Sequence, residues 1–288
     1  MVKVFILGNP RSGTSLFRLM LNQHSKIVAP PESGFMQWWL KKYKNWKTEH
    51  NITLRLDDFL NDLYSSSKFE TWEINKNKLK NFIISMNPGS YGELIGCVYL
   101  FYSERPEKVQ VVADKNNYYV HHIDDLQIIW PDAKYIHIIR DGRDVACSYL
   151  DIQKLRTNSP YKPKLPFTIN EIAKEWINNN QNIAKLAENS SENYMLVKYE
   201  DIITDTKVKL SRVSKFIGVE YEDSMLEYYK HSTAKKCEPK ETLDWKRKTL
   251  EKPDPSKINR YERDLSAEQI EQYNYIASKI LKSFGYYV

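Results

Sequence analysis

Five short apolar segments divide the chain, and each has the length of a β-strand. They are Val4–Leu7, Lys26–Ala29, Val109–Ala113, Tyr135–Ile139 and Tyr194–Val197. The segments between them carry apolar residues at helical spacing, most clearly over 168–188, 208–217 and 266–284. Strands that alternate with helices predict a parallel sheet covered on both faces, so we expect a three-layer α/β/α fold.

Residues 35–95 have a different pattern and predict a helical insertion beside the sheet. Leu56, Phe59, Leu60 and Leu63 form one face of an amphipathic helix. Before it lies an aromatic cluster of Trp38, Trp39, Tyr43 and Trp46. This cluster is either the core of the inserted helices or a wall for a substrate, and aromatic residues at such spacing favour the core. Residues 154–166 are rich in proline and lysine and predict a loop.

The bulk composition describes an ordinary globular protein. The 288 residues are 41% hydrophobic and 28% charged, and we expect one domain over 1–288. The net charge of +6 comes from scattered lysines, so no nucleic-acid-binding arm is predicted. Cys97, Cys147 and Cys237 form neither a disulfide framework nor a metal cluster, which favours a reducing compartment. No apolar run approaches the roughly 20 residues that span a bilayer, and the first strand begins too early for a signal peptide, so a cytoplasmic protein is expected.

The first strand leads directly into a glycine-bounded turn and a helix. Gly8 and Gly13 have the spacing of a phosphate-binding loop, in which N–H groups of the turn and of the helix N-terminus point at one anion. Thr14 stands where the lysine that contacts a triphosphate is expected, and Arg11 lies inside the loop. The pattern favours an anion other than a γ-phosphate, and the alternative is a glycine-rich turn without a ligand.

Polar residues follow every predicted strand. Arg11, Glu32, Lys115, Arg140 and Tyr199 each come directly after an apolar segment or within a few residues of one. Ligands of parallel α/β sheets bind beyond the carboxyl ends of the strands. We therefore expect these five side chains to meet at one site.

Two motifs at this edge resemble those of a known family. Pro10-Arg11-Ser12-Gly13-Thr14-Ser15 resembles the 5′-phosphosulfate loop of sulfotransferases, and the segment from Arg140 to Ser148 looks like their 3′-phosphate motif. Further similarities are Asp114-Lys115, Tyr199-Glu200-Asp201 and the segment 259–266, so the resemblance spans nearly the whole chain. It is strongest to the bacterial and Golgi-type branch that includes tyrosylprotein and carbohydrate sulfotransferases.

The resemblance implies 3′-phosphoadenosine 5′-phosphosulfate (PAPS) as the donor, with no metal required. It assigns the 5′-phosphosulfate to the loop residues Pro10, Arg11, Ser12, Gly13, Thr14 and Ser15, and the 3′-phosphate to Arg140 and Ser148. Tyr199 is expected at the adenine, and the alternative is an aromatic residue packed at the end of its strand. Arg260 and Tyr261 are expected in a basic loop over 235–265 that covers the 3′-phosphate and adenosine.

Glu32, Lys115 and Arg11 are the expected catalytic residues. Lys115 suits the bridging oxygen of the leaving group, and Glu32 is the expected general base. A loop carboxylate that merely pairs with a lysine is the simpler alternative for Glu32. The surrounding Pro-Pro-Glu-Ser-Gly sequence lacks the arginine that the tyrosylprotein branch has soon after its glutamate. Small-molecule, carbohydrate and peptide acceptors therefore all remain open. A non-catalytic nucleotide-binding protein and a small-molecule kinase are the other two hypotheses.

Overall fold

The fold is built on a five-stranded parallel sheet. A computed structural model describes residues 1–47, 52–189, 191–230 and 238–288. The strands are β1 (Val2–Leu7), β2 (Ile27–Val28), β3 (Val111–Lys115), β4 (Lys134–Ile139) and β5 (Tyr194–Lys198), in the order β2-β3-β1-β4-β5. All five predicted strands are present with shifted ends, and β2 contains two residues. The predicted parallel sheet is confirmed.

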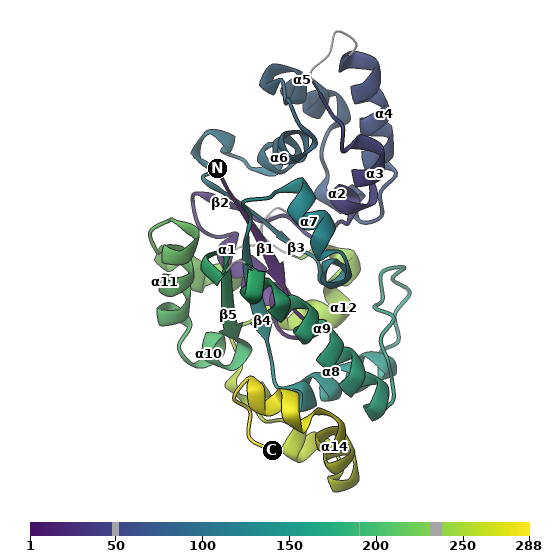
Figure 1. Ribbon diagram of the computed structural model, residues 1–288, viewed down its shortest axis with the longest axis vertical. Coiled ribbons are helices and arrows are strands. Elements are labelled where there is room, and N and C mark those ends of the chain that lie inside the picture. Colours follow the sequence, from purple (N-terminus) through teal and green to yellow (C-terminus); the bar gives the residue numbers. More distant parts are fainter. Residues whose placement is uncertain (48–51, 190, 231–237) are drawn as a thin grey trace.

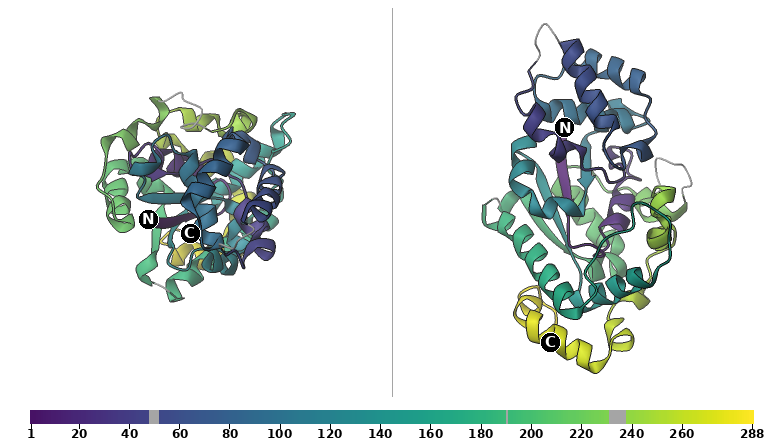
Figure 2. Two further views of the ribbon diagram at one scale, coloured as in Figure 1. Left: turned by 90° about the horizontal axis from the view of Figure 1, so that it is seen from above. Right: turned by 90° about the vertical axis from the view of Figure 1, so that its right-hand side faces the viewer.

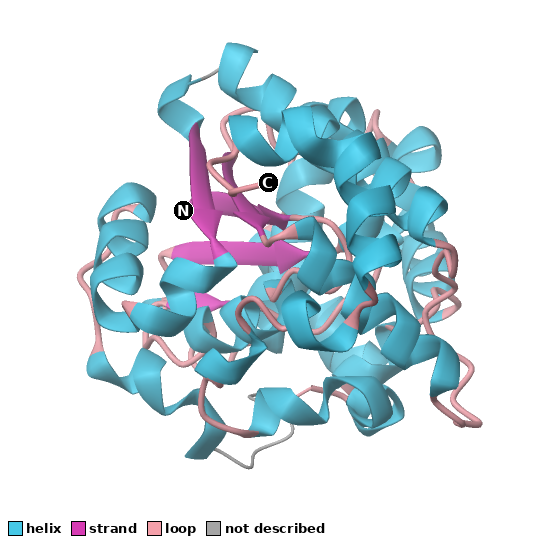
Figure 3. Ribbon diagram, turned by 90° about the horizontal axis from the view of Figure 1, so that it is seen from below, coloured by secondary structure: helices cyan, strands magenta, loops and turns pink. Residues whose placement is uncertain are grey.

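Side chains of the central strand point alternately to the two faces of the sheet. Val4 and Ile6 pack with α1 (Thr14–Leu21), α10 (Tyr199–Thr204) and α11 (Thr206–Ile217). Phe5 and Leu7 pack on the opposite face with residues of α6 (Tyr91–Tyr102), α7 (Ile123–Ile129) and α9 (Ile169–Asn189). Both faces are therefore buried, as the continuous apolar strands predict. Figure 3 shows the strands enclosed by helices, which confirms the three-layer arrangement.

The predicted insertion is helical and forms one end of the molecule (Figure 1). It contains α2 (Phe35–Trp38), α3 (Leu40–Tyr43), α4 (Ile52–Tyr64), α5 (Lys76–Met86) and α6. Its core is continuous with the side chains of the sheet, and α6 extends past the expected boundary at residue 95 to pack on β2 and β3. Tyr43 and Trp46 are both 2% exposed within this core, so the core interpretation is confirmed for them, whereas Trp38 is 40% exposed.

Trp72 links the core of the insertion to the loop that carries Glu32. Its ring contacts four aromatic residues, and its indole N–H donates to the Pro31 carbonyl at 3.0 Å. We expect Trp72→Ala to lower the free energy of unfolding by about 3–5 kcal/mol, because it leaves a large cavity. The control Trp38→Ala removes an exposed ring and should cost less than about 1 kcal/mol. Urea unfolding of the two variants measures both values, and equal losses would contradict this assignment of the core.

The opposite end of the molecule is formed by α8 (Gly142–Lys154), α13 (Tyr261–Asp264) and α14 (Ala267–Ser283), with α14 packed along α9 (Figures 1 and 2). A capping box of Ser266 and Gln269 begins α14. Of the expected loop over 235–265, residues 235–237 lie outside the described part of the chain. The rest folds into short helices that include α12 (Leu243–Lys246). The 3₁₀ helices of the structure are Phe69–Trp72, Pro106–Lys108, Asn117–His121, Ser191–Asn193, Asp223–Lys230, Lys240–Thr242, Arg247–Leu250 and Pro255–Lys257.

Candidate active site

A cavity of about 710 Å³ lies at the carboxyl ends of the strands. It brings together eleven of the thirteen residues that the sequence predicts for the site. These are Pro10, Arg11, Gly13, Thr14, Ser15, Glu32, Lys115, Arg140, Ser148, Tyr199 and Arg260. The convergence of strand ends is therefore confirmed, while Ser12 and Tyr261 do not line the cavity.

The loop between β1 and α1 folds tightly at one wall of this cavity. Arg11 and Gly13 both have left-handed backbone, with φ of 69° and 90°. The Ser12 N–H donates to the Asn9 carbonyl at 3.2 Å, so it closes the turn. Asn9 is itself fixed by Tyr149 at 3.0 Å and Asn179 at 2.8 Å. The first N–H groups of α1 have no partner inside the helix, so they are the donors of this loop that an anion could use.

Gly13 is required in this loop for two reasons. Its φ is left-handed, and a Cβ atom there would lie 2.4 Å from the Tyr199 ring. At Gly218 the φ is +83° but no atom lies within 4 Å of the added carbon. We expect Gly218→Ala to cost about 1–2 kcal/mol of folding free energy from its backbone alone. Gly13→Ala should cost about 1–3 kcal/mol more because of the clash. Urea denaturation of both variants checks the difference, and equal costs would exclude close packing of Tyr199 on the loop.

Two arginines converge on the same side of the cavity. Arg11 donates from Nε to the Ser148 hydroxyl and from Nη2 to the Trp245 carbonyl, both at 3.0 Å. Arg140 donates to the Lys257 carbonyl at 2.6 Å, and its guanidinium lies 4.4 Å from the centre of the Tyr199 ring. Burial and the charge of Arg140 lower the pKa of Arg11 to about 10. Because the charge of Arg140 lowers the pKa of Arg11, the two guanidiniums repel each other, and an anion between them would relieve that repulsion.

Glu32 lines the same cavity and lies among three lysines. Its Oε1 accepts a hydrogen bond from Lys115, the last residue of β3, and its Oε2 lies 3.2 Å from the Lys68 Nζ. The Lys246 Nζ, at the end of α12, lies 3.6 Å from Oε2. Burial favours the neutral acid, but the three ammonium groups outweigh it and hold the pKa of Glu32 well below its usual value. Burial lowers the pKa of Lys115 to about 8, against the opposing effect of Glu32.

The two expected nucleotide-covering residues are placed differently. Arg260 lines the cavity and pairs with Asp151 at 2.9 Å and with Asp264 at 2.6 Å. Tyr261 does not line the cavity: its N–H donates to the Asp144 carboxylate, and its ring lies 4.1 Å from the Arg143 guanidinium. The structure therefore does not bring Tyr261 to the site at which its stacking role is predicted.

Several residues of the cavity have no recognisable signal in the sequence. Lys68, Trp245 and Lys246 line it, and none belongs to the motifs that predict the site. Lys246 lies in a highly charged stretch without periodicity, so nothing in the pattern distinguishes it from a surface lysine. Its low exposure of 8% is a property of the tertiary structure alone.

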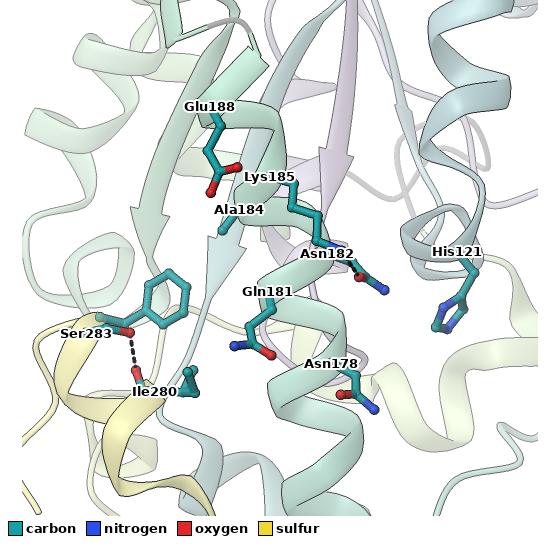
Figure 4. Close-up of a pocket in the computed structure, with 10 residues that line it drawn as sticks. His121, Asn178, Gln181, Asn182, Ala184, Lys185, Glu188, Ile280 and Ser283 are labelled. Carbon is teal, nitrogen blue, oxygen red and sulfur yellow. Dashed lines mark hydrogen bonds between the residues drawn. The ribbon is translucent and has the colours of Figure 1, made fainter.

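A second hollow of about 660 Å³ lies between α9 and α14 (Figure 4), and it shares no lining residue with the larger cavity. Asn178 and Gln181 of α9 line it together with His121. His121 and His122 are expected to be helix residues rather than bases, and neither lines the larger cavity. Cys147 is buried among apolar side chains, as packing predicts.

Within the described ranges, no group of three or more histidine, cysteine, aspartate or glutamate side chains is arranged to hold a metal ion. None of the helices in those ranges is long and apolar enough to cross a membrane.

A comparison with protein families identifies the chain. Residues 3–223 match the model that describes the sulfotransferase family. The chain belongs to the sulfotransferase family. This confirms the resemblance that the two arginine-bearing motifs predict.

Among curated proteins, protein-tyrosine sulfotransferase A of Caenorhabditis elegans is 23% identical over 229 residues, which are 78% of this chain. The match spans only 52% of that relative's length.

Solved structures of sulfotransferases share the fold. The sulfotransferase domain of the Synechococcus PCC 7002 olefin synthase has a TM-score of 0.62 at 20% identity, covering 100% of this chain and 96% of that one. The sulfotransferase domain of the curacin biosynthetic pathway gives 0.61 at 20% identity, with coverages of 99% and 98%. A mouse sulfotransferase complexed with PAP gives 0.52 at 12% identity, with coverages of 98% and 85%.

Proposed function

We propose that this sulfotransferase-family chain moves a sulfuryl group from PAPS to a hydroxyl or amine acceptor. The observation that carries the proposal is that Arg11 and Arg140 face the same cavity as the Glu32–Lys115 pair. Anion-binding groups and a carboxylate base are therefore within reach of one bound donor and one acceptor. A solved relative carries PAP, the form of the nucleotide that remains after transfer.

The cavity residues suit a doubly phosphorylated nucleotide. The Arg140 Nε is buried and has no hydrogen-bond partner among the described residues, so this guanidinium keeps a donor for a ligand oxygen. Arg11, together with the first N–H groups of α1, would hold the 5′-phosphate end. Arg140 and Ser148 would hold the 3′-phosphate, and Tyr199 would contact the adenine. Arg260 would contribute charge at the rim.

The reacting groups suit an in-line displacement. PAPS supplies the sulfuryl group and leaves as adenosine 3′,5′-bisphosphate. Glu32 would accept the proton of the acceptor as the new S–O or S–N bond forms. Lys115 would stabilise the electron pair that the bridging oxygen keeps when its bond to sulfur breaks. Each of these roles needs an ionised Glu32 and a protonated Lys115, which is the state that their ion pair favours.

The acceptor belongs to the proposal at the level of its reacting group. The curated relative is named a protein-tyrosine sulfotransferase, which makes a tyrosyl hydroxyl one candidate. Hydroxyl or amine groups of small molecules and carbohydrates are further candidates, and no nucleic-acid partner is proposed. We propose a cytoplasmic location, supported by the two buried cysteines Cys97 and Cys147, which form no disulfide.

Two experiments test the proposed function. Adenosine 3′,5′-bisphosphate at 100 times its Kd should stabilise the fold by about 2.7 kcal/mol, measured as a rise in melting temperature. A screen of hydroxyl and amine acceptors with sulfate-labelled PAPS should then yield a labelled product. Binding without transfer to any acceptor would support a non-catalytic nucleotide-binding protein. Magnesium-dependent consumption of ATP, with no response to the bisphosphate, would instead support a kinase.

A further inference from the structure

A buried array of charges connects helix α1 to Glu32. Arg18 of α1 donates to the Ala29 carbonyl at 2.7 Å and pairs with Glu238 at 2.8 Å. Glu238 pairs through its other oxygen with Lys246, also at 2.8 Å. The Lys246 Nζ then lies 3.6 Å from Glu32. The side chains of Arg18 and Glu238 are each 1% exposed and that of Lys246 is 8% exposed.

Removing such charges from water costs free energy unless they are paired and hydrogen-bonded. Among the ion pairs of the described residues around Glu32, four cations (Arg18, Lys68, Lys115 and Lys246) pair with two carboxylates, those of Glu32 and Glu238. The surplus positive charge faces the cavity, since Lys68, Lys115 and Lys246 all line it. A surplus of this sign is suited to an anionic ligand.

The distance from Lys246 to Glu32 puts its ammonium within reach of a group that reacts beside Glu32. An acceptor atom that gives its proton to Glu32 lies about 2.6–3.2 Å from that carboxylate. The atom that it attacks lies about 3–3.5 Å further on. Lys246, at 3.6 Å from the same carboxylate oxygen, is therefore within reach of the oxygens of the group being transferred. An ammonium has three donors, and Glu238 uses one of them.

Resting on the proposed function, we propose that Lys246 is a second catalytic lysine, which donates to the sulfuryl oxygens of PAPS, and that Glu238 is the positioning residue that holds it there. Lys246 keeps its proton throughout and stabilises charge on the transferring group. Glu238 acts through Lys246 and touches neither substrate. Its pairing with Arg18 ties this arrangement to α1, whose N-terminus forms part of the phosphate loop.

The test compares two nucleotides that differ by the sulfuryl group. PAPS and adenosine 3′,5′-bisphosphate are titrated calorimetrically into the wild-type protein and the Lys246→Met variant. Because a hydrogen bond from a charged donor is lost, PAPS should bind roughly 10- to 100-fold more weakly to the variant. The affinity for the bisphosphate should change less than about twofold, which also shows that the variant is folded. Lys240→Met, an exposed lysine of the same segment, should leave both affinities unchanged.

Glu238→Gln separates positioning from packing. It should weaken PAPS binding less than Lys246→Met does, and the double variant should be no weaker than Lys246→Met alone, because both changes act on one contact. Recovery of PAPS affinity in the double variant would overturn the proposal, since the loss would then come from an unpaired Glu238. Equal losses for both nucleotides, or no loss for either, would also overturn it. If the wild-type protein binds neither nucleotide, the proposed function itself fails.

Discussion

Replacing Lys115 by methionine is expected to slow sulfuryl transfer by on the order of 10²–10³-fold, the usual cost of removing one donor that stabilises charge in a transition state. Lys115 is 1% exposed at the end of β3 and is bonded to Glu32, so its ammonium is fixed in the cavity. The measurement is kcat with labelled PAPS and an acceptor found in the screen. Unchanged turnover in Lys115→Met would remove this residue from the mechanism.

The same lysine sets the expected alkaline limit of activity. Burial lowers its pKa to about 8, and only its protonated form carries the charge that the leaving group needs. Activity should therefore fall as the pH rises through about 8. Lys115→Arg keeps the charge to much higher pH, because a guanidinium does not titrate in this range. If that variant retains measurable turnover, its alkaline limit should move upward, and an unmoved limit would assign the titration to another group.

Glu32→Gln is expected to lower kcat by on the order of 10²–10⁴-fold, the range of general-base catalysis by a positioned side chain. The amide keeps the size of the carboxylate but cannot accept the proton. Because the surrounding lysines hold the pKa of Glu32 well below its usual value, the wild-type base remains ionised across the neutral range. Above pH 5, protonation of Glu32 should therefore cause no acid-side loss of activity.

The matched controls for this variant are Glu32→Asp and Glu70→Gln. The aspartate keeps the charge on a shorter side chain and should retain part of the activity. Glu70 accepts a hydrogen bond from Tyr161 but does not line the cavity, so Glu70→Gln should leave kcat within a few-fold of wild type. A Glu32→Gln variant that turns over like Glu70→Gln would leave Glu32 as a structural partner of Lys115. The affinity for adenosine 3′,5′-bisphosphate checks that each variant is folded.

The sheet and the strand-end residues could be predicted because their signals are local. A strand of four apolar residues and one histidine, followed by Arg140, is visible in the sequence. The topology of parallel sheets then places Arg11, Glu32 and Lys115 at the same edge. Contacts that depend on tertiary structure could not be predicted in this way. The orientation of Tyr261 is decided by a backbone bond to Asp144, 117 residues earlier in the chain.

Lys246 shows the same limit most clearly. It lies in a stretch with many charged residues and without periodicity, where an exposed lysine is the ordinary expectation. Its burial requires Glu238, and the pairing of Glu238 requires Arg18, which is 220 residues away. Each of these three charges would cost free energy if it were buried alone, and pairing lowers that cost when all three are buried together. No single segment of the sequence contains that information.

The wall formed by residues 238–260 has a consequence for how enzymes of this kind diversify. Trp245, Lys246 and Lys257 contact Arg11, Glu32 and Arg140, respectively, yet all three come after residue 223, where the family match ends. The family-matched region holds nearly the whole sheet, whereas substitutions in the later segment can reshape the cavity without touching a strand. Exchange of this segment between related enzymes should therefore change how the reacting groups are held, and with it the turnover, while the sheet stays intact.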